Sequence, residues 1–535
     1  MNGSTSTATT ESSRRWVALA VLCLSLLIVT LDATVLNVAL PTLVRKLHAS
    51  SSDLQWIVDA YVLVFACLML VAGSLGDRIG RKRTFLAGLV AFAACSTWAA
   101  FSGSVGMLIA ARASMGIGAA LIMPSTLAII TNTFTDRHER QRAIGFWAAT
   151  SGAGIALGPI VAGLLLARFA WGSVFLINVP IAAAGFALAL ALVADSKNPA
   201  AQRPDVVGSL LSIAGLGLLL YGIIEAPVHG WTSALVLTTG LGGLAILGAF
   251  VAWEWRSEHP MLNLRFFTER SFSGAIISVA LTMFGLLGAL FLLTQFLQFD
   301  LGYTPLQAGV RMLPAAGAIA VVAPLSSQLV RRLGTRVTIT IGLVLVAAGL
   351  WQISGATVAT TYSGIVVGMA LLGLGAGLVI PSTAGSVMGS LPEEHTGVGA
   401  GTNGTFLQAG GALGVAVIGS LLATRYQNDM ITALAAHPIP HPIEQTILGS
   451  VGGALGVAGH LGGVAGAFIA HAARGAFISG MRLGLRTAAI VAIAGAALAL
   501  AILPGRKLHR RTHDRPATTR RTARPHPVRP SGHSR

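Results

Sequence analysis

Three charged side chains lie inside long apolar runs of this sequence, and they are its first candidates for chemistry. Asp32 lies in the run that begins at Trp16, while Asp59 and Arg112 lie in later runs. A charge within hydrocarbon is costly and usually marks an ion path, a proton relay or a ligand site. A carboxylate away from water holds its proton more tightly, and a nearby cation opposes this effect. We therefore expect Asp32, Asp59 and Arg112 to take part in binding a proton or a cationic ligand.

The depth of these side chains follows from helix geometry. At about 1.5 Å of rise per residue, Asp32 lies about 24 Å along a helix that begins at Trp16. Asp59 and Arg112 lie within about two turns of the start of their own runs, so all three fall in the same half of a membrane. Asp59 is nearest to a helix end, and exposure to water is the alternative interpretation for it. Asp32, which we expect to lack a fixed partner, is the first candidate for the proton or substrate site.

A short charged segment, 73–83, separates two of the apolar runs and reads Gly-Ser-Leu-Gly-Asp-Arg-Ile-Gly-Arg-Lys-Arg. Its cations place it on the cytoplasmic side of a membrane, and its glycines allow a tight turn. An ordinary positive-inside turn would explain the cations but neither the carboxylate nor the glycine spacing. The residues we expect to act in gating are Gly73, Asp77, Arg78, Gly80, Arg81 and Arg83.

A glycine-rich helix is expected near residues 142–167. Glycines spaced four apart let a second helix pack closely, and a proline removes one backbone hydrogen bond and bends the helix. Spacing of this kind alone is common in membrane helices, but a Gly-Pro pair flanked by further glycines is more specific. The residues concerned are Gly154, Gly158, Pro159 and Gly163.

A third group combines aromatic and amide side chains. Gln295, Phe296 and Phe299 lie close together in a later apolar run. Binding pockets use apolar walls with a few placed polar groups, so these residues are candidates for a substrate cavity. The alternative is that the aromatic rings face lipid or pack between helices.

Composition assigns the chain to the membrane. The 535 residues are 54% hydrophobic and 10% charged, with a mean hydropathy of +0.75, whereas soluble domains carry about 25% charged residues. Soluble enzyme folds are therefore excluded. The three cysteines stand alone without metal spacing. Phosphate-loop and hydrolase motifs are also missing, which argues against ATP coupling and catalysis. We expect no enzyme activity, cofactor or metal.

Apolar runs of about 20 residues predict the spans. We expect fourteen, near 16–40, 54–75, 84–102, 105–131, 142–167, 172–193, 206–226, 233–254, 272–299, 306–330, 337–354, 362–388, 399–422 and 483–503. The distribution of Lys and Arg places both termini in the cytoplasm, even without the basic end of the chain. One stretch, Thr446–Ala470, could be a fifteenth span. We place it instead in an outer loop, 426–481, with an interfacial helix.

The chain repeats itself at an offset of 257 residues. Gly116–Thr126 reads almost like Gly373–Thr383, and internal repeats of this kind build many secondary transporters. The predicted fold is all-α, with two six-helix bundles related by pseudo-symmetry and two extra helices between them. The predicted parts are a cytoplasmic tail 1–15, a bundle 16–193, a linker 194–205, two extra helices 206–254, a bundle 271–503 and a tail 504–535.

The last part of the chain, 504–535, is basic and rich in Pro, Thr and His, without apolar periodicity. Such a composition predicts disorder. Basic tails can bind nucleic acid, but next to a membrane end the anionic lipid headgroups are the simpler partner. We therefore expect no nucleic-acid partner.

These motifs together resemble the fourteen-span drug:proton antiporters of the major facilitator superfamily. The segment 73–83 is similar to the loop between spans 2 and 3 of that superfamily. Leu31–Pro41 resembles the span 1 motif of the fourteen-span branch. Arg112, together with Gly116, Gly118 and Pro124, is similar to the span 4 motif. Gly154–Gly163 resembles the span 5 antiporter motif found in exporters. Ala162 stands where that motif often has glycine, which we expect to loosen one contact.

The resemblance implies a proton-coupled exporter of lipophilic, aromatic or cationic drugs that works by alternating access in a bacterial cell membrane, as a monomer. It implies that Arg112 takes part in proton coupling. It also implies that Asp77 interacts with the start of span 13, near Gly397–Thr402, because a helix N-terminus attracts a carboxylate. Two alternatives stay open. One is a dedicated exporter of a single metabolite or amino acid, and the other is a sensor with a transporter fold.

Overall fold

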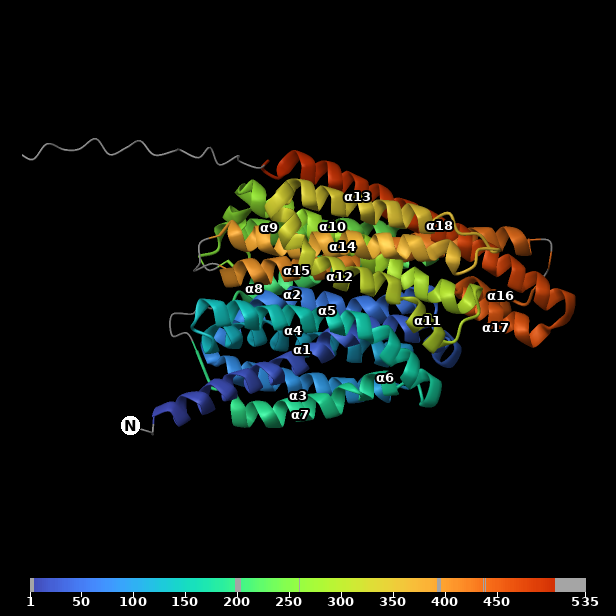
Figure 1. Cartoon of the computed structure of the whole chain (residues 1–535). Coiled ribbons are helices and arrows are strands. Elements are labelled where there is room, and N and C mark those ends of the chain that lie inside the picture. Colours follow the sequence, from blue (N-terminus) through green and yellow to red (C-terminus); the bar gives the residue numbers. More distant parts are fainter. Residues whose placement is uncertain are drawn as a thin grey trace, which may run out of the picture.

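The computed structural model describes residues 4–197, 204–258, 260–391, 396–435, 437 and 439–505. All regular structure in these residues is helical, and the long helices run side by side (Figure 1). The predicted all-α fold is therefore confirmed. The basic tail from 506 onwards and linker residues 198–203 lie outside the described residues.

The first bundle contains the helices up to residue 192. They are α1 (Ser4–Leu47), α2 (Ser51–Ile79), α3 (Arg81–Ala100), α4 (Val105–Thr133), α5 (Arg137–Arg168), α6 (Ser173–Leu176) and α7 (Asn178–Leu192). The expected tail 1–15 is largely part of α1. The two extra helices are α8 (Val206–His229) and α9 (Ala234–Arg256).

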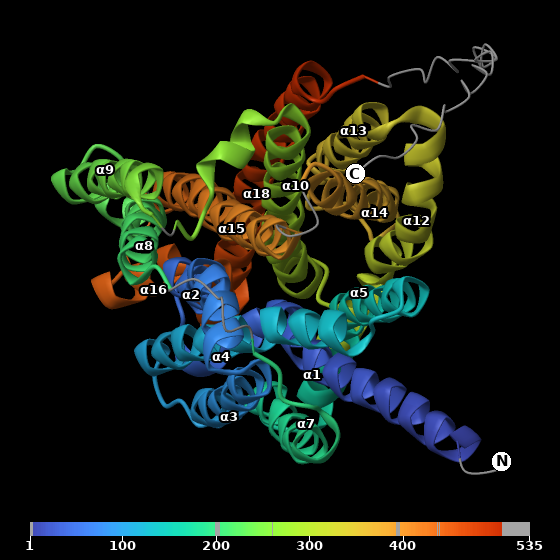
Figure 2. The ribbon, with the colours of Figure 1, turned by 90° about the vertical axis from the view of Figure 1, so that its left-hand side faces the viewer.

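The second bundle follows a short connection, η1 (Leu264–Thr268). Its helices are α10 (Arg270–Gln295) with a π-helical end η2 (Phe296–Asp300), α11 (Pro305–Arg311), α12 (Leu313–Leu333), α13 (Thr335–Ile353), α14 (Ser363–Gly389), α15 (Thr396–Leu434) and α18 (Gly463–Ile502). Two short helices, α16 (His441–Gly449) and α17 (Val451–Leu461), connect α15 to α18. Figure 2 shows the two bundles from the end at which α1 begins, with α8 and α9 at their side.

Among the described residues, thirteen helical stretches are long and apolar enough to cross a membrane. The remaining predicted span, 142–167, lies in α5. This helix has 32 residues, and its apolar part among the described residues is Leu157–Arg168. At about 1.5 Å per residue, α5 is about 48 Å long, which exceeds the hydrocarbon thickness of about 30 Å.

The repeat in the sequence has a direct structural meaning. A Cβ on Gly116 would lie 2.7 Å from a backbone oxygen of α2, and one on Gly118 would lie 2.8 Å from the backbone of α3. In the second bundle, Gly373 and Gly375 meet the backbones of α12 and α13 in the same way. Each pair of glycines thus lets one central helix touch two neighbours, and the two bundles use the same device.

The segment after α14 differs from the expected outer loop. α15 continues to Leu434 and α18 begins at Gly463, so most of 426–481 is helical. Thr446–Ala470 is not a fifteenth span, because the chain breaks at Ser450 and again at Gly462 and Gly463, both of which have positive φ. α17, with 11 residues, is about 16 Å long and too short to cross hydrocarbon.

The molecule has two distinct ends. We call the end that carries segment 73–83 the basic end, and the end that carries α16 and α17 the far end. α1 begins and α18 finishes at the basic end (Figure 1). At the far end α17 contacts both bundles, because a Cβ on Gly452 would lie 2.6 Å from Phe299 of η2 and 2.6 Å from Val44 of α1.

Candidate functional site

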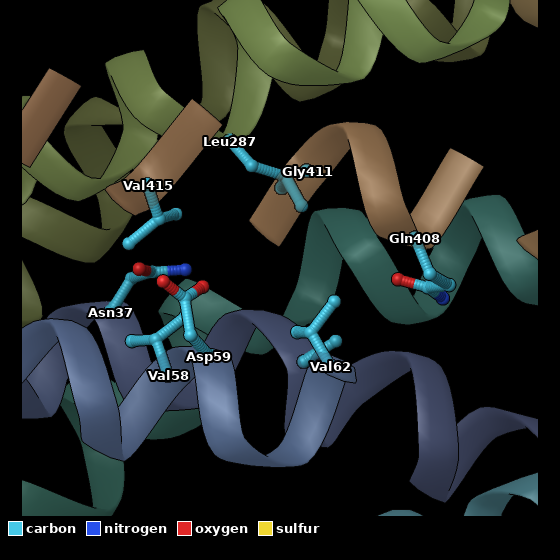
Figure 3. Close-up of a pocket in the computed structure, with 9 residues that line it drawn as sticks. Asn37, Val58, Asp59, Val62, Leu287, Gln408, Gly411 and Val415 are labelled. Carbon is cyan, nitrogen blue, oxygen red and sulfur yellow. The ribbon is translucent and has the colours of Figure 1, made fainter. Parts of the chain in front are cut away.

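A small pocket lies between the two bundles (Figure 3). Four helices form its wall: α1 and α2 from the first bundle, and α10 and α15 from the second. Its lining is apolar with one carboxylate and two amides. The lining residues are Ala33, Asn37, Val58, Asp59, Val62, Leu287, Gln408, Gly411 and Val415.

Asp59 is the one ionisable side chain in this lining. It is fully buried, and neither of its carboxylate oxygens has a hydrogen-bond partner among the described residues. Its carboxylate points into the pocket beside the amide of Asn37 (Figure 3). The alternative of simple water exposure is therefore wrong. α2 begins at Ser51 behind a capping box formed by Ser50 and Asp53, which places Asp59 more than two turns inside the helix.

Asp32 has a different environment, although it lies on the adjoining helix α1. Its Oδ2 lies 2.5 Å from Nη1 of Arg112, and both side chains are only 1% exposed. Its Oδ1 accepts a hydrogen bond of 3.1 Å from the amide of Asn178 at the start of α7. The expectation that Asp32 lacks a fixed partner is therefore wrong, because two helices each supply a donor to it.

Arg112 is held from several sides. Its Nε donates to the carbonyl oxygen of Ile57 at 3.1 Å, and its guanidinium carbon lies 4.2 Å from the ring centroid of Tyr61. A planar guanidinium that is anchored at a second nitrogen and stacked on a ring holds its carboxylate partner in one geometry. The pair with Asp32 is thus a rigid, neutralised unit inside the first bundle.

Segment 73–83 forms ion pairs within the first bundle. Arg81 donates to the carboxylate of Asp77 at 2.6 Å and to the carbonyl of Ala128 at 3.2 Å. Arg83 lies 3.6 Å from Asp195, and Gly80 turns the chain with φ of 121°. The contact predicted between Asp77 and the start of α15 is not among the contacts of the described residues and stays a prediction. Gly73 packs on α4, and Arg78 is exposed.

The glycine-rich helix α5 contacts both bundles. A Cβ on Gly154 or Gly158 would collide with a threonine hydroxyl of α1, and one on Gly163 would lie 2.5 Å from the backbone of Leu306 in α11. The carbonyl of Pro159 lies against Gly309, also in α11. This helix therefore joins the two bundles in its far-end half.

The aromatic group on α10 lies away from the pocket. Gln295 donates to a carbonyl of its own helix at 3.0 Å, and Phe296 is fully buried. Phe299 packs against Gly452 of α17 at the far end. The pocket instead uses Leu287, two turns earlier on the same helix. A role of Gln295, Phe296 and Phe299 in substrate binding stays a prediction.

Comparison with known proteins now identifies the family. The sequence matches the model of the Major Facilitator Superfamily over residues 22–220 and 182–415. The chain belongs to this superfamily. Its fold resembles that of a solved bacterial homologue of the human lysosomal transporter Spinster, with a TM-score of 0.62 at 17% identity over 91% of this chain and 97% of the other.

Curated relatives cover nearly the whole chain. The tetracenomycin C resistance and export protein of Streptomyces glaucescens is 33% identical over 91% of each chain. The multidrug efflux pump LfrA of Mycolicibacterium smegmatis is 36% identical over 92% of this chain and 97% of its own. The methyl viologen resistance protein SmvA of Salmonella typhimurium is 35% identical over 89% and 95%, respectively.

Sequence reasoning missed several polar residues of this superfamily member. Asn37 and Gln408 line the pocket, and Asn178 holds Asp32. A signal for them exists, because each is an uncharged amide inside an otherwise apolar run. Amides in membrane helices usually find a partner or a cavity, so weighting them like the charged residues would have found all three.

Proposed function

We propose that this protein exports lipophilic, aromatic or cationic drugs in exchange for protons, by alternating access. The observation that carries the proposal is Asp59, a fully buried carboxylate without a hydrogen-bond partner in the described structure, in a pocket between the bundles. Isolated buried charge is expensive, so this site favours either a protonated acid or a carboxylate with a bound cation. A proton and a cationic drug would then exclude each other at one group.

The remaining lining supports substrates of this chemical class. Val58, Val62, Leu287 and Val415 form apolar walls, and the amides of Asn37 and Gln408 supply polar contacts. This combination is common in pockets for small organic ligands. The names of the relatives, which include multidrug and methyl viologen resistance proteins, agree with it.

The described conformation supports a far end that is closed. There, α5 packs backbone to backbone on α11, and the amide of Gln298 on the second bundle donates to the carbonyl of Val38 on the first at 2.9 Å. Alternating access requires these contacts to break, so that the pocket opens to the outside and releases its substrate.

Within this proposal, Asp32 and Arg112 position the helices around the pocket and respond to the charge on Asp59. The basic end is the cytoplasmic end, and Asp77 leaves Arg81 for the start of α15 when the cytoplasmic side closes. The protein works as a monomer in the bacterial inner membrane, and its basic tail, which is outside the described residues, contacts anionic lipid. The positive-inside rule supports this orientation.

Vesicles test the function directly. Inverted vesicles that carry the protein and a proton gradient should accumulate a fluorescent lipophilic cation, and a protonophore should abolish the accumulation. A susceptibility panel in a host without its own pumps would separate multidrug export from export of one dedicated metabolite. Accumulation that survives the protonophore and requires ATP would contradict the proposal.

A further inference from the structure

The extra helix α8 lies at the side of the two bundles, where it contacts both α2 and α15 (Figure 2). None of the residues that line the pocket or are proposed to couple protons lies on this helix. Its far-end half carries Pro227, and the carbonyl groups just before this proline face polar side chains from both bundles.

Pro227 creates a hydrogen-bond acceptor on α8. A proline has no backbone N–H, so the carbonyl four residues earlier, that of Ile223, loses its partner within the helix. The hydroxyl of Ser420 on α15 donates to this carbonyl at 2.7 Å. Ser420 is 0% exposed, and Ile223 is half-buried. The serine hydroxyl therefore makes this bond away from bulk water.

The first bundle joins the same cluster through α2. Gln55 is fully buried, and its side-chain oxygen lies 3.2 Å from the hydroxyl of Ser420. One turn around the helix, Ser52 donates to the carbonyl of Ile224 at 3.2 Å. A Cβ on Gly419 would lie 2.7 Å from the side chain of Gln55, so the glycine leaves room for this amide between α2 and α15.

We propose that Gln55, Ser420 and the freed carbonyl of Ile223 form a polar latch that holds the far end closed, with Pro227 as the residue that makes the latch possible. This inference rests on the proposed alternating access. When α2 and α15 separate, the contact of Gln55 with Ser420 must break. Because α8 can follow only one bundle, either Ser420 leaves Ile223 or Ser52 leaves Ile224.

If the latch holds the far end closed, it should limit how often a reagent outside the cell can reach the pocket. In a variant without Cys23, Cys67 and Cys95, Val415→Cys places a thiol in the pocket. A membrane-impermeant maleimide added to intact cells would reach this thiol only when the far end opens. Val464→Cys, at a position that is 90% exposed on the far-end part of α18, reports insertion and expression.

Ser420→Ala should raise the labelling rate of the pocket thiol by about two- to tenfold, as expected from the loss of one buried hydrogen bond. Pro227→Ala should raise it in the same direction, because the new N–H competes for the carbonyl of Ile223. Two matched controls should leave the rate unchanged. Ser278→Ala removes a buried hydroxyl that bonds its own helix, and Pro324→Ala removes a helix proline far from α8.

The outcomes separate the latch from the transport cycle. If the parent thiol is labelled slowly and both Ser420→Ala and Pro227→Ala are labelled at the parent rate, the latch is rejected while alternating access stands. If neither the parent nor the variants are labelled, although the thiol at 464 reacts fully, the pocket does not open outwards. Both the latch and the proposed cycle are then rejected.

Discussion

Two carboxylates on adjoining helices, Asp32 and Asp59, meet opposite environments in this protein. Asp32 contacts a guanidinium and an amide, whereas Asp59 faces a pocket and has no hydrogen-bond partner among the described residues. Both are nearly or fully buried, so burial alone does not distinguish them. The difference teaches that a buried charge with fixed partners organises a bundle, while one without them is available to a ligand or a proton.

The largest effect on export is expected at Asp59. Asp59→Asn should lower the export of a lipophilic cation by at least about tenfold, since the loss of one buried charged contact is worth about 1.5–3 kcal/mol, with a smaller loss for neutral drugs. Its thermal stability should not fall, because no internal partner is left behind among the described contacts. Fluorescent-cation uptake into inverted vesicles and thermal unfolding in detergent measure the two effects. Asp429→Asn, which removes a partly exposed carboxylate paired with Arg425, is the control.

The contrast between the two carboxylates would be lost if Asp59→Asn exported cations at the unmodified rate. In that case the pocket carboxylate would not bind substrate or proton, and the coupling would have to involve Asp32 after all.

The second effect concerns the pair of Asp32 and Arg112. Asp32→Asn or Arg112→Gln alone should lower the free energy of unfolding by about 3–5 kcal/mol, because each leaves a buried charge without its partner. The double variant should recover a large part of this loss, since neither charge remains. Thermal unfolding of the four proteins forms the double-mutant cycle. Additive losses in the double variant would mean that the pair does not stabilise the bundle as a unit.

A smaller effect is expected at Asn178, which donates to Asp32 at 3.1 Å and to the hydroxyl of Ser96 at 3.2 Å. Asn178→Ala removes both bonds and should cost about 1–3 kcal/mol of stability. Cation export should fall only a few-fold, because Arg112 still neutralises Asp32. Equal losses of export in Asn178→Ala and Asp59→Asn would contradict the assignment of Asn178 as a positioning residue and of Asp59 as the binding residue.

Much of this architecture could be predicted from sequence because it depends on local patterns. Apolar runs gave the helices, and the repeated glycines gave two similar bundles, since a missing side chain is a local property that permits close packing. The depths of Asp32 and Arg112 followed from helix rise alone. Rise does not give the direction in which a side chain points, however, and the two residues are 80 positions apart in the chain. Their pairing was therefore hidden.

The environment of Asp59 was hidden for another reason. Its pocket is completed by Gln408, Gly411 and Val415 of the second bundle, so burial depends on how the two bundles meet. The helical far end was also missed, because apolar periodicity does not distinguish a long helix that leaves the membrane from a loop followed by a short one. The role of Asp77 at the start of α15 still rests on resemblance and awaits its own variant.

The extended helices at the far end have a practical consequence. α15 has 39 residues and α18 has 40, and each is about 60 Å long, roughly twice the thickness of hydrocarbon. Transporters of this size otherwise present almost no rigid surface outside detergent or lipid. The projecting ends of α15 and α18, together with α16 and α17, give an antibody fragment or nanobody a structured epitope. Such a complex would provide the asymmetric mass that particle alignment in electron cryomicroscopy requires.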